Sequence, residues 1–133
     1  MADSGRDAGV REETSANRVL VVTTDERLRA ELADAFPADY EVDMVLDARG
    51  ALGYLETHRP AVLVVDIQTG SSGGYGLLKD IQQDSRIAAV PAVMVLERSQ
   101  DKWLAKQAGA ELILTKPVSA ERVVADALSL VAA

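Results

Sequence analysis

Short runs of consecutive Val, Leu and Ile residues recur along this chain, and each run is followed by a segment with helical spacing. Apolar runs without polar alternation are typical of strands whose two faces are both covered. Strands interleaved with helices form parallel sheets. The pattern therefore predicts five parallel strands with helices on both faces, and the expected strands span residues 18–23, 40–45, 61–66, 91–96 and 111–115.

The second of these runs differs from the others, because it alternates apolar residues with Glu41 and Asp43. Alternation indicates a strand that is only partly buried, as at the edge of a sheet. Placing this strand at an edge predicts the strand order 2-1-3-4-5. The expected fold class is thus α/β, a flavodoxin-like (βα)5 three-layer sandwich around a five-stranded parallel sheet.

The chain of 133 residues is long enough for one domain with a substantial core. Residues 1–17 are polar and charged, without periodicity, and are predicted to be a disordered leader. The domain is expected to cover residues 18–133.

Composition excludes several classes of protein. A net charge of -7 argues against direct nucleic-acid binding, which usually requires a basic face. The absence of cysteine excludes disulfides and thiolate metal sites. No apolar run approaches the roughly 20 residues of a membrane helix, and the first residues lack the apolar stretch of a signal peptide. We therefore expect a cytoplasmic protein without a membrane partner.

Charged side chains stand where two of the expected strands end. Asp66 ends the third apolar run, and Lys116 directly follows the fifth. Because parallel strands share one carboxyl edge, and open α/β sheets place their sites there, we expect these two side chains to lie together. Thr23 and Thr24 follow the first apolar run, so the first strand contributes no carboxylate directly at its end.

The chain resembles a receiver domain of the response-regulator family over residues 18–131. No single motif is specific, but the order and spacing of the motifs match well. They are the run Val19–Val22, Asp66, Gly74 eight residues later, Ala108–Gly109–Ala110 before the last strand, and Lys116–Pro117 after it.

The resemblance implies roles for these residues. In receivers, the aspartate that ends strand three accepts a phosphoryl group from a histidine kinase, and the lysine after strand five grips the phosphoryl oxygens. Asp66 is accordingly the candidate phosphoacceptor, Lys116 its cationic partner, and Pro117 a candidate cis-proline. Metal and lysine are needed because phosphoryl transfer onto a carboxylate crowds negative charges together.

The chain departs from the family at the metal-binding positions. Receivers carry two acidic residues after strand one that help to hold Mg²⁺, but Thr23 and Thr24 occupy these positions here. Asp25 comes next, and we expect its carboxylate to point elsewhere because it begins the following helix. Mg²⁺ prefers anionic oxygen and gives up water reluctantly. No metal site is therefore predicted.

The positions that respond to phosphorylation also differ. Leu96 stands where receivers have Thr or Ser, Glu97 where they have a small residue, and Ile113 where they have an aromatic residue. Glu97 would repel a phosphoryl group, which carries a charge of about -1.5 to -2. These departures, together with Thr23, Thr24 and Asp25, predict an atypical receiver with a degenerate pocket.

Several of these residues also have purely structural interpretations. Thr23 and Glu26 fit a capping box at a helix start. Asp66 and Lys116 can pair as an ion bridge, an interpretation that we favour over phosphotransfer. The Gly/Ser segment at 69–74 is expected to be a flexible loop, since it does not match a phosphate-binding P-loop. Trp103 is expected to pack in the core, although an exposed tryptophan there would be a binding anchor.

Three functions remain open from the sequence. The leading hypothesis is a non-enzymatic two-component receiver domain that acts through protein–protein contacts without phosphorylation. Its partner would be a histidine kinase, an output protein or a second copy, bound through the fourth helix, fifth strand and fifth helix. The alternative is a phosphorelay receiver with Asp66 as acceptor and with Asp25 or Glu97 recruited for Mg²⁺. The third is a small-molecule sensor beside the 69–74 loop, which fold alone supports.

Overall fold

The computed structural model describes residues 17–68 and 73–131, so that most of the predicted leader and of the 69–74 loop lies outside the described residues. The chain alternates strands and helices from end to end. In order, the elements are β1 (Arg18–Val22), α2 (Glu26–Ala35), β2 (Glu41–Val45), α3 (Ala48–Thr57), β3 (Val62–Asp66), α4 (Gly73–Gln82), β4 (Ala92–Leu96), the 3-10 helix η1 (Ser99–Asp101), α5 (Lys102–Ala108), β5 (Leu112–Thr115) and α6 (Ala120–Leu130).

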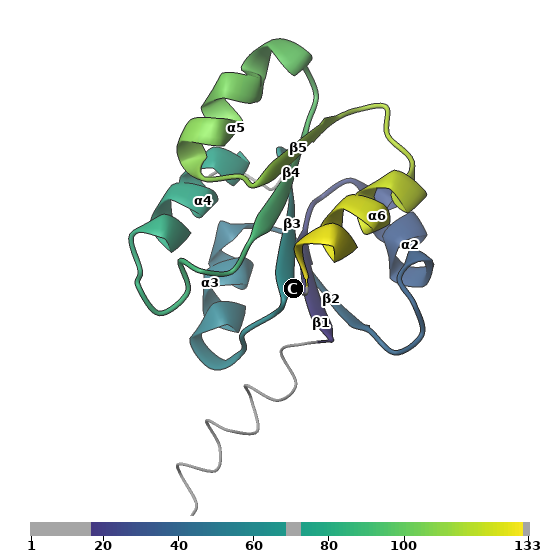
Figure 1. The fold of residues 1–133 in the computed structure, drawn as a ribbon, viewed down its shortest axis with the longest axis horizontal. Helices are drawn as coiled ribbons and strands as arrows, with labels where there is room; N and C mark the ends of the chain where they lie inside the picture. The colour runs from purple at the N-terminus through teal and green to yellow at the C-terminus, as the bar shows by residue number, and fades with distance from the viewer. Residues whose placement is uncertain (1–16, 69–72, 132–133) are drawn as a thin grey trace, which may run out of the picture.

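The five strands form one sheet in the order β2-β1-β3-β4-β5, and every neighbouring pair is parallel (Figure 1). This confirms the predicted fold class and strand order. Each predicted strand boundary lies within one residue of the observed one. The three central strands are buried almost throughout, whereas β2 and β5 at the edges are mostly half-buried.

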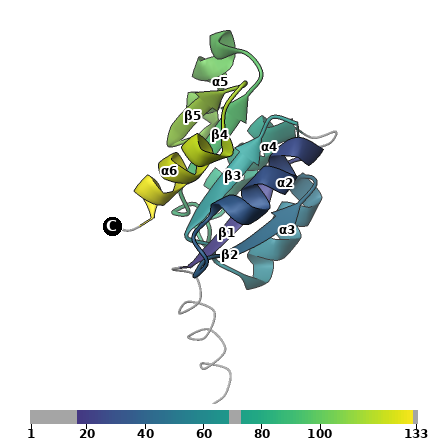
Figure 2. The same cartoon turned by 90° about the vertical axis from the view of Figure 1, so that its right-hand side faces the viewer.

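Helices cover both faces of the sheet, which makes three layers. Helices α3, α4 and α5 lie on one face, and α2 and α6 lie on the other (Figures 1 and 2). Alternate residues of each buried strand point into the two resulting clusters, so Leu20 packs with the first set of helices and Val21 with the second. None of the helices in the part of the chain that the structure describes is long and apolar enough to cross a bilayer.

Two glycines have conformations or surroundings that disfavour any side chain. A Cβ on Gly74 would lie 2.7 Å from Met94 Cε and 3.0 Å from Val65 Cγ1, so α4 approaches the sheet too closely for a side chain. Gly109 ends α5 in the left-handed region, with φ of 108°. Both glycines belong to the motifs that carry the family resemblance, which gives those motifs a physical reason.

Candidate functional site

Asp66 and Lys116 lie together at the carboxyl edge of the sheet. Lys116 Nζ is 2.9 Å from Asp66 Oδ2, although the two residues are 50 positions apart in the sequence. Parallel pairing brings the ends of β3 and β5 to the same edge, with β4 between them. The site therefore lies where open α/β sheets place their ligands.

Asp66 is completely buried, and both of its oxygens accept hydrogen bonds. Oδ2 accepts from Thr23 Oγ1 at 2.6 Å and from Lys116 Nζ at 2.9 Å, and Oδ1 accepts from the Gln68 backbone N–H at 3.2 Å. A buried carboxylate is stable only when it is paired and hydrogen-bonded. Asp66 meets this requirement without any ligand.

Lys116 is the centre of a polar cluster. Its ammonium group lies within hydrogen-bond distance of four side-chain oxygens, from Asp25 at 2.8 Å, Asp66 at 2.9 Å, Gln68 at 2.9 Å and Glu97 at 3.3 Å. Burial alone would lower the pKa of Lys116, but the hydrogen bonds to Asp25 and Asp66 outweigh it and raise the pKa above its usual value. A lysine has only three N–H donors, so the four oxygens share them.

Asp25 is part of this cluster, and the expectation that its carboxylate points elsewhere is wrong. Asp25 is the N-cap of α2 and has extended backbone, with φ -74° and ψ 106°. Its Oδ1 accepts from the N–H groups of Arg27 and Leu28, which leaves Oδ2 for Lys116. The Lys116 hydrogen bond, followed by that from Leu28, lowers the pKa of Asp25.

Thr23 does not cap the helix, so the predicted capping box with Glu26 is also wrong. Its side chain is fully buried, accepts from the Asp25 backbone N–H at 2.9 Å and donates to Asp66. Thr23 thus orders the turn that places Asp25 at the N-cap. The hydroxyl proton of Thr23 is donated to Asp66, and Thr23 offers no carboxylate at this position.

Gln68 was not predicted as a site residue, yet it bonds to Asp66 and Lys116 of the cluster and to the neighbouring Thr24. Its backbone N–H donates to Asp66, its backbone oxygen accepts from the N–H of Thr24 at 2.7 Å, and its side-chain oxygen accepts from Lys116. Thr24 itself is exposed. A polar side chain two residues after a strand-ending aspartate was the available sequence signal.

The remaining predicted pocket residues divide into buried and exposed positions. Leu96 ends β4 fully buried in the core, so β4 offers no polar group there. Glu97 follows it, is half-exposed and reaches toward Lys116. Ile113 is partly buried against the hydrophobic core that lies between the sheet and α3, α4 and α5, and it is the register partner of Met94 in β4. None of the three provides the hydroxyl or aromatic group of the family pattern.

The donor set does not fit Mg²⁺. Within residues 17–68 and 73–131, no group of three His, Cys, Asp or Glu side chains is arranged to hold a metal ion. Thr23 points its proton at Asp66, and both oxygens of Asp25 are already occupied by N–H donors. The ammonium of Lys116 supplies the positive charge that faces these carboxylates.

A cleft of about 300 Å³ opens beside the cluster, between the start of α2 and the loop after β5. The Lys116–Pro117 peptide bond at its wall is cis, as expected for Pro117. Charged and apolar side chains mix in its lining, which comprises Asp25, Arg27, Leu28, Glu31, Glu97, Lys116, Pro117 and Val118.

The expectation that Trp103 packs in the core is wrong. Its side chain lies on the surface, with an exposed fraction of 56%. Helix α5 turns Ala105 and Ala108 toward the core instead. Since α5 is only seven residues long, its buried stripe is narrow, and the small alanines allow it to lie close to the sheet.

Comparison with known proteins agrees with this geometry. The sequence model of the response regulator receiver domain family matches residues 19–128 of this chain. Response regulator Rre1 of Synechocystis sp. is 30% identical over 118 residues, which are 85% of this chain and 51% of Rre1. The transcriptional regulatory protein PhoP of Escherichia coli (strain K12) is 32% identical over 109 residues, 81% of this chain and 49% of PhoP. The chain spans about half the length of the curated relatives that it matches.

Solved structures share the fold. The receiver domain of the Francisella response regulator 1452 superposes with a TM-score of 0.77 at 21% identity, covering 86% of this chain and 95% of that one. The chemotaxis response regulator CheY4 of Vibrio cholerae gives a TM-score of 0.78 at 24% identity, covering 85% and 97%. With the matched residues 19–128 spanning the whole sheet, this chain belongs to the family of response regulator receiver domains of two-component signalling.

Proposed function

We propose that this receiver domain is a non-enzymatic interaction module whose partner binding does not depend on phosphorylation of Asp66. One observation carries the proposal: Asp66 is fully buried, with both oxygens hydrogen-bonded and with Lys116 as its counter-ion. A phosphoacceptor must present a free oxygen in line with the donor phosphate. Here that oxygen would first have to lose existing partners.

The charge balance of the cluster supports the same proposal. Lys116 is the one cation within 4 Å of Asp25, Asp66 and Glu97 among the described residues. A phosphoryl group would add a charge of about -1.5 to -2 to these carboxylates. Without a fitting metal site, this negative charge would be only partly neutralised, which disfavours the transfer.

A phosphorelay role with Asp66 as acceptor is the second candidate, favoured by the short Asp66–Lys116 distance. It requires Asp25 or Glu97 to be recruited for Mg²⁺. Both carboxylates bind Lys116, so recruitment would have to break contacts of 2.8 and 3.3 Å. This cost makes the second candidate the weaker one.

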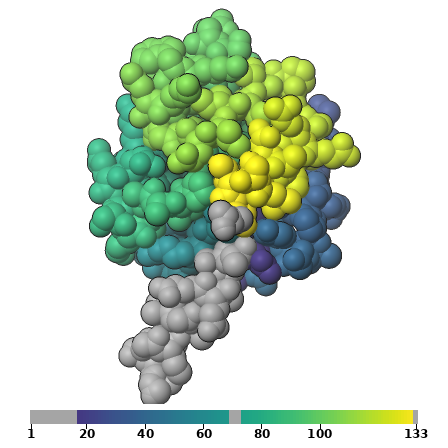
Figure 3. Space-filling model, viewed as in Figure 1, coloured from purple at the N-terminus to yellow at the C-terminus, as the bar shows by residue number. Residues whose placement is uncertain are grey.

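The proposed partner surface is the face formed by α5, β5 and α6. These three elements lie side by side on the face seen in Figure 3. The proposed occupants are a histidine kinase, an output protein or a second copy of the domain. The resemblance to receivers, which use this face for partners, supports the assignment.

The proposal is tested by incubating the protein with acetyl phosphate and Mg²⁺ and measuring its intact mass. We expect no phosphoryl adduct, or a trace that Asp66→Asn leaves unchanged. Stoichiometric phosphorylation that Asp66→Asn abolishes would overturn the proposal and establish the phosphorelay role.

A further inference from the structure

The outer face of α5 combines one aromatic and two cationic side chains. Lys102, Trp103, Lys106 and Gln107 are all exposed, whereas Ala105 and Ala108 point to the core. Trp103 and Leu46 are the two large hydrophobic side chains that are exposed among the described residues. Helical geometry places Trp103 and Lys106, three residues apart, next to each other on the surface. We call Lys102, Trp103 and Lys106 the α5 patch.

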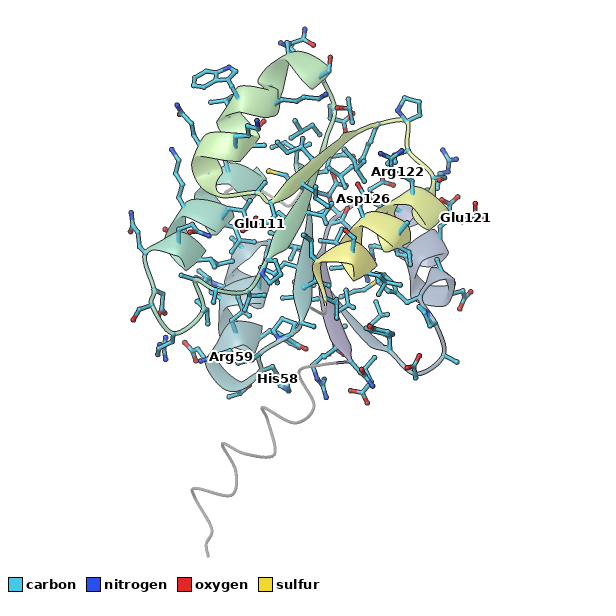
Figure 4. All side chains as sticks on the ribbon, in the orientation of Figure 1. His58, Arg59, Glu111, Glu121, Arg122 and Asp126 are labelled. Carbon is cyan, nitrogen blue, oxygen red and sulfur yellow. The ribbon has the colours of Figure 1, made fainter. Side chains whose placement is uncertain are left out.

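The lysines of the α5 patch form no salt bridge within the described part of the chain. Neither Lys102 nor Lys106 has an ion-pair partner there, and Asp101 beside them pairs with Arg98 at 3.7 Å. The two lysines lie four residues apart, so they repel each other. The acids Glu121 and Asp126 lie on α6, across β5 from α5 (Figure 4), where Asp126 pairs with Arg122 at 3.3 Å.

This basic patch stands on a chain with a net charge of -7. Positive charge that persists locally against the overall charge directs encounters with partners of the opposite sign. A tryptophan offers a large apolar area with few rotatable bonds, and such residues carry much of the binding energy at interfaces. The patch thus favours a partner that supplies carboxylates around an apolar side chain.

We infer that the α5 patch binds an acidic segment of a partner protein, with an apolar side chain packed on Trp103 and carboxylates paired with Lys102 and Lys106. This inference rests on the proposed function, because it names the chemistry of the partner. Two lysines are too few to hold nucleic acid or an anionic membrane on a chain of this net charge. An acidic protein segment needs only short-range pairing.

The test uses the full chain and a synthetic probe. The probe is an acetylated and amidated 15-residue peptide of Ala, Glu and Leu, in which two Glu residues four positions apart bracket one Leu. A matched control peptide replaces Glu by Gln. Trp103 is the sole tryptophan of the chain, so its emission reports binding at the α5 patch directly. We expect the acidic peptide to shift the emission to the blue, saturably and less at high salt.

Variants separate the α5 patch from the rest of the surface. By anisotropy of a labelled acidic peptide, Trp103→Ala is expected to raise Kd at least about 30-fold, as for interface hot spots. Lys102→Gln and Lys106→Gln are each expected to raise it about two- to fivefold. Lys79→Gln, which removes an exposed lysine of α4, is the matched control and should leave Kd unchanged.

Each alternative outcome overturns the inference. The first is equal binding of the Gln peptide, and the second is no binding of the acidic peptide either with or without Mg²⁺ and beryllium fluoride. The third is an emission shift caused only by duplex DNA or anionic phosphatidylglycerol vesicles. The fourth is a shift that follows protein concentration alone, which would mean a second copy. Repeating the titration with Mg²⁺ and beryllium fluoride separates the two proposals. Peptide binding that requires these additions would sustain the α5 patch but refute phosphorylation independence, whereas no binding under either condition would refute only the α5 patch.

Discussion

Removing the charge of Lys116 is expected to destabilise the domain strongly. In Lys116→Met, Asp66 stays fully buried but keeps only the hydrogen bonds from Thr23 and Gln68. Asp25 and Glu97 lose their cation as well, although both are partly exposed and water can replace it. Breaking a buried pair by removing one partner costs about 3–5 kcal/mol, and we expect about 3 kcal/mol here.

Asp66→Asn should cost much less. The amide retains the shape of Asp66 and an oxygen that accepts from Thr23 or Lys116, and Lys116 keeps Asp25 and Glu97 as partners. We expect a loss of about 1 kcal/mol. In the double variant, the uncompensated buried charge is gone. Its loss in free energy of unfolding should therefore be about 2 kcal/mol smaller than the sum of the losses in the two single variants.

Urea unfolding followed by far-ultraviolet circular dichroism measures all four proteins of this cycle. Tryptophan emission is a poorer probe, because Trp103 is already 56% exposed in the folded state. The slope of the free energy against urea should stay constant, which shows that only stability has changed. A cost below about 1 kcal/mol for Lys116→Met, with additive effects in the double variant, would refute the view that Lys116 compensates the buried charge of Asp66.

Three further predictions concern stability and are checked by the same urea unfolding. Thr23→Val should cost about 2 kcal/mol, because it removes one hydrogen bond to the buried Asp66 carboxylate and the acceptor of the Asp25 backbone N–H. Thr24→Val on the surface should stay within about 0.5 kcal/mol, and equal effects of the two variants would contradict the assigned role of Thr23. Gly74→Ala should cost about 1–3 kcal/mol through overpacking, whereas Gly76→Ala, whose Cβ would meet nothing within 4 Å, should stabilise α4 by up to about 1 kcal/mol. The pKa of Asp25 is lowered below 3.8 in the folded state, so the ionised carboxylate stabilises the fold above pH 3.8 and this stabilisation is lost as the pH falls through the folded-state pKa. Asp25→Asn should therefore flatten the acidic part of a plot of the free energy of unfolding against pH. An unchanged acidic part would contradict the lowered pKa.

The sheet could be predicted because the apolar runs are governed by burial alone. Strands β1, β3 and β4 lie inside the sheet and carry charged residues only at their ends, whereas Glu41 and Asp43 within β2 mark it as an edge. The proximity of Asp66 and Lys116 followed from the same argument, since it depends only on strand direction. These features are set by topology rather than by the details of any one loop.

The features that were missed depend on backbone conformations that a periodic pattern does not encode. Asp25 lies two residues beyond the predicted cap, and this small offset turns its carboxylate toward Lys116. Gln68 bonds to the cluster because of the path of the chain after β3. Trp103 is exposed because Ala105 and Ala108 already fill the short contact between α5 and the sheet, a packing outcome that spacing alone did not decide.

We propose that Lys116 fills the pocket around Asp66 and that this pocket does not respond to phosphorylation. Two-dimensional amide NMR spectra of the labelled protein, recorded during titration with Mg²⁺ and then beryllium fluoride, test it most directly, with Asp66→Asn as the control. We expect the amide signals of Thr24, Asp66 and Lys116 to stay unchanged. Saturable shifts at these residues that spread to Leu96 and Ile113, and that vanish in Asp66→Asn, would contradict it.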